Sequence, residues 1–298
     1  MSRSRFFLFV AASFLCLSSL LATCSSIEAA EKLKALIIDG QNNHEWQKTT
    51  PLLDQMLQKS GRFVADVATT PKSGEEMKSF RPKFSDYDVI ISNYNGDRWP
   101  KETEEDFVEY LKNGGGFVSV HAADNAFATW PEYNEAIGLG GWFGRDEKSG
   151  PYVYYKDNEL VRDDSPGRCG GHGQQHEFIV RKRNADHPIM KGIPERWLHA
   201  QDELYDTLRG PAKNMTILAT AYSDPKTGGT DRDEPSLMVL DFGKGRVFHT
   251  TMGHADYSMD CVGFITTLLR GAEWAATGEV TIEVPDDFPT AEKSSKRE

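Results

Sequence analysis

Histidine residues follow the ends of several short apolar runs in this sequence. His121 comes directly after the run 117–120, and His44 and His254 each follow another run within a few residues. If these runs are parallel strands, their carboxyl ends lie at one edge of a sheet, where open α/β proteins bind ligands. Neutral imidazoles that converge there are typical ligands of zinc or a similar divalent ion. We therefore expect His44, His121 and His254 as metal ligands, although a single histidine can instead bond a backbone carbonyl.

Two further segments carry groups suited to acid–base chemistry. Asp202 and Glu203 are adjacent carboxylates before an aromatic residue, and they could act as acid, base or ligand, or form a solvated turn. His172 and His176 lie four residues apart in a glycine-rich segment. On a helix this spacing would resemble an HExxH zinc site, but the glycines disfavour a helix. The expected catalytic residues are His121, His176, Asp202 and Glu203.

Other residues near the same predicted edge have the chemistry of a carbohydrate site. Aromatic faces pack against the C–H faces of a sugar, whereas carboxylates and amides bond its hydroxyl groups; packing in the core is the alternative role for the aromatic residues. The expected substrate-binding residues are Trp46, Asn95, Asp124, Tyr205 and Asp256. Further aromatic residues in or near these loops are Tyr94, Trp99, Trp130 and Trp142.

The elements that must position these groups alternate along the chain. Apolar runs typical of buried strands lie at 33–39, 63–67, 88–92 and 117–120. Helical spacing of apolar residues separates the first two, and a second helix is expected after Pro100. This alternation predicts an α/β fold, a three-layer sandwich in which helices cover a mostly parallel central sheet.

The second half of the chain has a different pattern. Glycines cluster between residues 138 and 185, which indicates an insertion that is functional or carries its own small sheet. The main sheet is expected to resume with strands at 216–221, 236–241 and 246–251, before a closing helix at 259–276.

Composition limits the class of protein. The 298-residue chain has a formal net charge of −11, and 39% of its residues are hydrophobic. This apolar fraction is ample for a buried core. An acidic surface repels phosphate backbones, so nucleic acid is not an expected partner.

The first residues have the pattern of a secretory signal. Arg3 and Arg5 precede the apolar stretch 6–21, and small residues follow. We expect residues 1–30 to be a signal peptide and the protein to be periplasmic or extracellular, with no membrane span in the mature chain. An uncleaved anchor is one alternative, and a lipid anchor at Cys24 is a weaker one.

The mature chain is expected to be one domain, residues 31–285, followed by a loose tail at 286–298. Cys169 and Cys261 remain after the leader and could pair in an oxidising compartment. Because no CxxC motif occurs, a thiolate zinc site is not expected. The sequence does not indicate an oligomeric state.

Several motifs in order resemble the ThuA-like (trehalose-utilisation) family, which has a class I glutamine amidotransferase-like, flavodoxin-like fold. The matching segments are GGGFVSVH at 114–121, DHPIMKGIP at 186–194, DELY at 202–205, GKGRVFHTTMGH at 243–254 and RGAEWAATG at 270–278. The resemblance covers nearly the whole mature chain, from about residue 33 to 280.

The resemblance has two implications for function. Class I amidotransferases carry a nucleophilic cysteine after the strand that here precedes His121, so glutaminase activity is not expected. The family is linked to disaccharide catabolism and to 3-keto sugars, which implies a small-molecule carbohydrate partner. The expectation is an exported isomerase, lyase or hydrolase of a 3-keto disaccharide or glycoside that uses acid–base and metal-assisted chemistry. A carbohydrate-binding protein without catalysis is the alternative.

Overall fold

The computed structural model describes residue 1 and residues 31–297, and its compact unit begins at Lys32. The expected signal peptide, with the lipid site considered at Cys24, therefore lies outside the described residues apart from Met1. Within the part of the chain that the structure describes, no helix combines the length and apolar character needed to cross a membrane.

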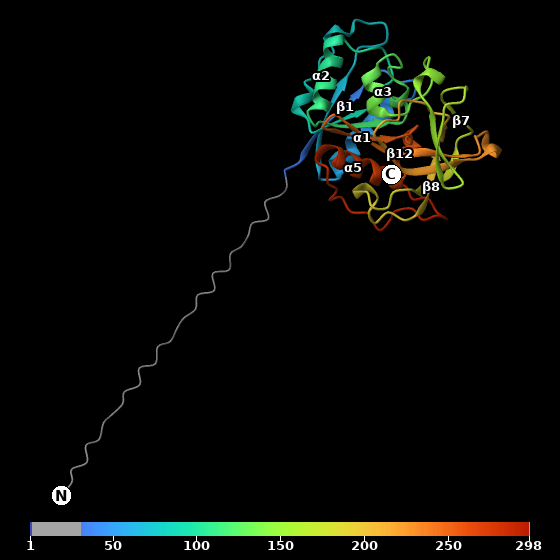
Figure 1. Ribbon diagram of the computed structural model, residues 1–298. Helices are drawn as coiled ribbons and strands as arrows, with labels where there is room; N and C mark the ends of the chain where they lie inside the picture. The colour runs from blue at the N-terminus through green and yellow to red at the C-terminus, as the bar shows by residue number, and fades with distance from the viewer. Residues whose placement is uncertain (2–30, 298) are drawn as a thin grey trace. The chain divides into compact units, whose positions relative to one another are not determined.

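One half of the main sheet is parallel and contains the strands expected early in the chain. These strands are β1 (Leu33–Asp39), β2 (Phe63–Thr69), β3 (Val89–Ser92), β4 (Gly116–Val120) and β13 (Gly245–Thr250). They lie in the order β2-β1-β3-β4-β13, and each neighbouring pair is parallel. The carboxyl ends of β1, β4 and β13 therefore lie at one edge of the sheet. Figure 1 labels β1 in this half of the sheet.

The other half of the sheet is antiparallel, so the expectation of a mostly parallel sheet is too simple. It continues from β13 through β12 (Arg232–Phe242), β11 (Met215–Ser223), β8 (His176–Lys182) and β9 (Arg196–Asp202). Two residues join β12 to β13, and so short a connection permits only an antiparallel pair. Four successive reversals leave β9 pointing in the same direction as β13, so both strands end at the same edge.

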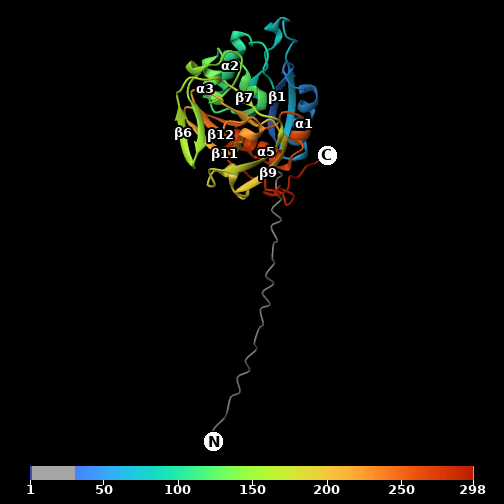
Figure 2. The same cartoon turned by 90° about the vertical axis from the view of Figure 1, so that its right-hand side faces the viewer.

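Strands of the glycine-rich segment 138–185 pair with strands outside it. Its hairpin of β5 (Tyr152–Lys156) and β6 (Glu159–Asp163) pairs with β12 in the main sheet. Its short strand β7 (Gly171–His172) pairs with β10 (Tyr205–Asp206) in a separate two-stranded sheet. Figure 2 shows β6 at the side of the molecule away from α1.

Helices cover both faces of the parallel half and complete three layers. The helices α1 (Trp46–Lys59) and α5 (Val262–Thr277) contribute to one buried apolar cluster, whereas α2 (Lys101–Lys112) and α3 (Pro131–Ile137) contribute to the other. Alternate residues of β1 enter the two clusters, as expected for a strand buried on both faces. The remaining helices are α4 (Asp256–Met259), η1 (Met77–Ser79), η2 (Phe84–Asp86), η3 (His121–Asn125), η4 (Glu147–Ser149), η5 (Pro188–Met190) and η6 (Pro225–Thr227).

Helix α5 binds the segment 188–191 and packs closely on the sheet. The buried Arg270 guanidinium donates to the carbonyl oxygens of Pro188, Ile189 and Lys191 at 2.8–2.9 Å. Because these carbonyls are otherwise removed from water, the arginine satisfies groups that would be costly to bury unpaired. At Gly271 the helix approaches the sheet so closely that an added Cβ would lie 2.2 Å from the ring of Phe248.

The C-terminal segment differs from the expected loose tail. Phe288 is buried, and the carbonyl of Ser295 accepts a 2.8 Å hydrogen bond from the backbone N–H of Val262. Arg297 forms an ion pair with Asp287 at 2.6 Å. Buried apolar side chains and backbone hydrogen bonds hold residues 286–297 against the start of α5. The charge-rich composition of this segment does not by itself indicate such packing. Cys169 and Cys261 are both buried and are not joined by a disulfide.

Glu234 in β12 is a buried carboxyl group with few partners. It is 3% exposed, and its Oε1 accepts a 2.8 Å hydrogen bond from Thr230 Oγ1. Burial raises the pKa of Glu234 from 4.5 to about 7, because the low-dielectric surroundings disfavour the charged form and Asp206 lies nearby. Glu234 is therefore protonated in the folded protein over a pH range in which an unfolded chain has lost that proton.

We expect Gly271→Ala to destabilise the protein by about 1–3 kcal/mol despite the higher helix propensity of alanine, because its methyl group overlaps the Phe248 ring. Denaturant unfolding measures the free energy. The same substitution in a Phe248→Leu background is the control, and a smaller cost there is expected. An equal cost in both backgrounds would show that the close approach to Phe248 is not the cause.

We expect the stabilising effect of Glu234→Gln to depend on pH. Below pH 4.5 the carboxyl is protonated in both states; between pH 4.5 and about 7 only the unfolded chain ionises, so wild-type stability falls as pH rises. Relative to wild type, the variant should gain on the order of 3 kcal/mol between pH 4 and 8. Urea unfolding at several pH values measures this gain, and a pH-independent difference would contradict the assignment.

Candidate functional site

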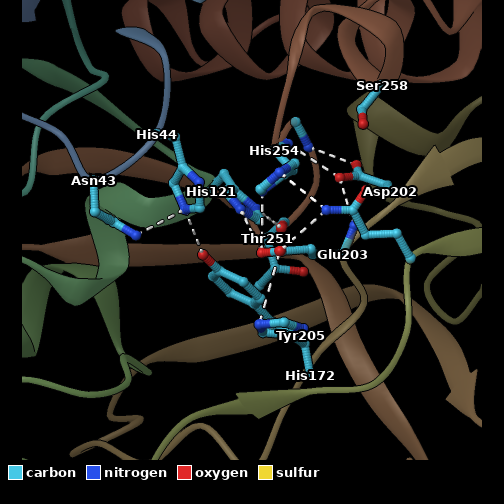
Figure 3. A network of polar contacts seen from close by, with 12 residues as sticks. Asn43, His44, His121, His172, Asp202, Glu203, Tyr205, Thr251, His254 and Ser258 are labelled. Carbon is cyan, nitrogen blue, oxygen red and sulfur yellow. Dashed lines mark hydrogen bonds and ion pairs between the residues drawn. The ribbon is translucent and has the colours of Figure 1, made fainter. Parts of the chain in front are cut away.

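Three histidines and one glutamate from four strand ends converge on one point. His44 follows β1, His121 follows β4, Glu203 follows β9 and His254 follows β13, and one ligand atom from each lies within 4.8 Å of the others. Figure 3 shows their side chains turned toward a common centre. We call these four residues the histidine–glutamate cluster. The structure thus brings together all three histidines that the sequence predicted as metal ligands.

His121 occupies a sharp turn between β4 and η3. Its φ of 45° is left-handed, a conformation that costs a non-glycine residue roughly 1–2 kcal/mol. Its Nδ1 lies 2.7 Å from the carbonyl oxygen of Thr251, so this nitrogen carries the proton and donates it. The other nitrogen, Nε2, then presents a lone pair to the cluster, 3.6 Å from Glu203 Oε2.

Asp202 was expected to be catalytic, but it lies behind the cluster. Its buried carboxylate accepts hydrogen bonds from the backbone N–H groups of Glu203, Gly253 and His254 at 2.7–3.0 Å. It also lies 2.8 Å from Nε2 of His199. With its lone pairs engaged, Asp202 positions Glu203 and His254 and is not free to accept a proton from a substrate.

The loop after β1 holds His44 through its neighbours. The backbone N–H of His44 donates to Asn42 Oδ1 at 2.9 Å, and Asn43 Nδ2 lies 3.3 Å from His44 Nε2. Asn95, expected to bind substrate, instead bonds Asn43 through both its amide atoms. The Tyr205 hydroxyl lies 3.4 Å from His44 Nε2 and its ring centroid 4.1 Å from that of His121, so Tyr205 belongs to the site.

Burial and neighbouring charges give the cluster members different proton affinities. Burial, reinforced by His121 and His254, lowers the pKa of His44 to about 3, so this imidazole is neutral. Burial by itself would lower the pKa of His121. Its interactions with Glu203, Asp202 and the Thr251 carbonyl outweigh this effect and raise the pKa overall. Burial raises the pKa of Glu203, yet His121 and His254 shift it strongly downward overall, so Glu203 is a carboxylate.

Four other expected site residues do not join the cluster. His176 Nδ1 bonds the carbonyl of Gln174 at 2.7 Å. Asp124 is buried and pairs with His249 at 3.3 Å. Asp256, the first residue of α4, accepts from the backbone N–H of Tyr257. Trp46 begins α1 and is half-buried, and no described contact joins it to the cluster.

Most of the additional aromatic residues are core residues. Tyr94, Trp99 and Trp130 are at most 3% exposed and pack in the apolar cluster beneath α2 and α3. Their proximity in sequence to strand ends therefore does not place them at the edge of the site. Trp142 is the exception, since its ring centroid lies 4.7 Å from that of Tyr205.

The segment 169–176 brings two further polar residues to the site: His172, which the sequence singled out only for its spacing from His176, and Gln175, which it did not select. His172 Nε2 lies 3.7 Å from Glu203 Oε1. Gln175 Nε2 lies 3.3 Å from the same oxygen and 3.1 Å from His254 Nε2, while Gln175 Oε1 accepts from the Tyr257 hydroxyl at 2.5 Å. The glycines of this segment predicted a loop, and they were the one indication that the sequence offered. The pairing of β7 with β10, which directs this loop toward the cluster, leaves no pattern in the local sequence.

Comparison with known proteins agrees with this architecture. A profile of the ThuA family, described as trehalose utilisation, matches residues 34–275. A solved ThuA-like protein from Parabacteroides merdae is 52% identical, with 90% of this chain and 98% of that chain covered and a TM-score of 0.88. A ThuA-like protein from Bacteroides uniformis shares the fold at 24% identity, with 85% and 95% covered and a TM-score of 0.58. No curated protein matches the chain. The resemblance seen in the motifs is confirmed, and the chain belongs to the ThuA (trehalose utilisation) family.

Proposed function

We propose that this protein is an exported enzyme that processes an oxidised sugar, such as a 3-keto disaccharide or glycoside, by metal-assisted acid–base chemistry. The observation that carries the proposal is the set of three imidazoles and one carboxylate whose ligand atoms lie within 4.8 Å of one another. Membership in a family described as trehalose utilisation supports a carbohydrate substrate. The charged and apolar pattern of residues 1–30 supports export.

The cluster fits a divalent ion such as zinc. Three histidines, with or without a carboxylate, are a donor set that catalytic zinc sites use. His121 Nε2 and His254 Nδ1 are buried without a hydrogen-bond partner, although Glu203 Oε2 lies 3.6 and 3.1 Å away. The lone pair of His121 Nε2 is buried with no donor, which is costly, and a cation beside this nitrogen would satisfy it.

The chain's own groups suit removal of a proton next to a ketone. An ion held by the three imidazoles would supply positive charge near the oxygen on which negative charge develops. Glu203 would accept the proton from the carbon next to the carbonyl; the electron pair of that C–H bond would form a C=C bond as the C=O π pair moves onto the ketone oxygen. Return of the proton to another position gives isomerisation, and departure of a group from the neighbouring carbon gives elimination.

We expect the purified protein to bind about one zinc ion per chain. His121→Ala and His254→Ala should each weaken zinc binding by more than about 100-fold, because each removes an imidazole from the cluster. Elemental analysis after dialysis measures the stoichiometry. His176→Ala, which removes a histidine outside the cluster, is the matched control and should keep the wild-type content. Near-zero zinc in wild type after loading would remove the metal from the proposal.

We expect Glu203→Gln to lower turnover of a 3-keto glycoside by about 100-fold or more, because an amide cannot accept the proton. Product formation followed by chromatography measures this loss, with zinc content recorded for the same samples. Binding of the sugar by wild type without any product would instead favour the carbohydrate-binding alternative. Full turnover by the variant would exclude Glu203 as the base.

A further inference from the structure

Three aromatic rings lead outward from the histidine–glutamate cluster. The Tyr205 ring lies against His121, and the Trp142 ring centroid is 4.7 Å from that of Tyr205. The His172 ring centroid lies 6.3 Å from both Trp142 and Tyr205. These rings therefore form a continuous surface that starts at the cluster and extends away from it.

Exposure increases along this surface. The side chain of His121 is 3% exposed, whereas that of His172 is 39% exposed. Phe143, the residue after Trp142, is 59% exposed, which is unusual for a large apolar side chain. The rings of Trp142 and His172 thus mark the open mouth of the site, and Phe143 extends from the same loop into solvent.

The backbone that presents the two aromatic residues is strained and firmly anchored. Trp142 and Phe143 have φ values of 52° and 46°, both left-handed. Such conformations cost roughly 1–2 kcal/mol each and persist where the surroundings impose them. The buried guanidinium of Arg145 donates to the carbonyl oxygens of Gly141 and Asn125 at 2.8 and 2.9 Å. An added Cβ at Gly170 would lie 2.6 Å from the indole of Trp142.

We propose that Trp142 and His172 form a pyranose-binding subsite at the mouth of the histidine–glutamate cluster. This inference rests on the proposed function and assigns the residues that hold the sugar beside it. The indole has an electron-rich face, which attracts the weakly positive C–H groups on one face of a pyranose ring. A rigid aromatic surface binds such a ring without losing much side-chain freedom.

The polar groups at the mouth select a sugar over a purely apolar ligand. His172 Nδ1 lies 2.8 Å from the carbonyl oxygen of Gly173 and donates to it, so Nε2 is free to accept from a hydroxyl group. Glu203 Oε1, 3.7 Å from that nitrogen, accepts from a second hydroxyl. An apolar ligand would leave His172 Nε2 without a donor, whereas a sugar hydroxyl supplies one.

The test is calorimetric titration of the zinc-loaded protein with trehalose and with methyl glucopyranoside. Trp142→Ala should weaken binding of both sugars by about tenfold, whereas Trp142→Phe should retain most of the affinity. Leu160→Ala removes a similarly exposed apolar side chain, 54% exposed, from β6 and should leave affinity unchanged. Zinc content, measured on every variant, should stay at the wild-type value, and an unfolding curve for each variant should show it fully folded at the temperature of the titration.

The outcomes separate this inference from the proposed function. Binding by Trp142→Ala within twofold of wild type overturns the subsite and leaves the metal-assisted chemistry standing. A loss of affinity that accompanies a loss of zinc also overturns it, since Trp142 would then act through the cluster. If wild type holds one zinc ion but binds neither sugar, the carbohydrate assignment fails and the subsite fails with it.

Discussion

The carboxylate of Asp202 is the interaction on which the geometry of the site depends. It is fully buried, and a buried charge persists only when hydrogen bonds replace the water it has lost. The backbone N–H groups of Glu203, Gly253 and His254 provide three of these bonds, and His199 provides the fourth. Burial alone would raise the pKa of Asp202, but these donors reverse the shift and keep it ionised. Because the N–H donors come from the ends of two different strands, one carboxylate fixes the separation of Glu203 from His254.

That arrangement requires the sheet to curl. In the strand order, β9 lies at the far end of the main sheet from β1, yet Glu203 meets His44 at the cluster. The antiparallel strands therefore fold back over α5, as the right-handed twist of successive strands permits. Contacts hold the curl in place: Ser258 in α4 donates to the carbonyl of Gln201 in β9 at 2.8 Å. Gly263 in α5 lets Trp197 of β9 approach, since a Cβ there would lie 2.8 Å from the indole nitrogen.

The sequence was sufficient for the parallel half of the fold and for most of the cluster. Its strands are short apolar runs buried on both faces, and the rule that ligands bind at their carboxyl ends placed three histidines together. It was not sufficient for β9, whose pattern is interrupted by the buried polar residues His199 and Asp202. Those residues are tolerated because they bond each other and because the N–H groups of Gly253 and His254, distant in sequence, also donate to Asp202. The same limit applies to Trp99 and Trp130, which follow strand ends or helices in sequence but face the core.

The position of His121 shows how the fold restricts the chemistry available. At the turn after β4 the structure has an imidazole in a left-handed conformation. Its Nδ1 proton is committed to Thr251, so only Nε2 can act, and that nitrogen faces Glu203 and two other imidazoles. Both described thiols are buried, and Cys261 is separated from the cluster by His199 and Asp202. The arrangement therefore favours stabilising charge and moving a proton over forming a covalent intermediate with the protein.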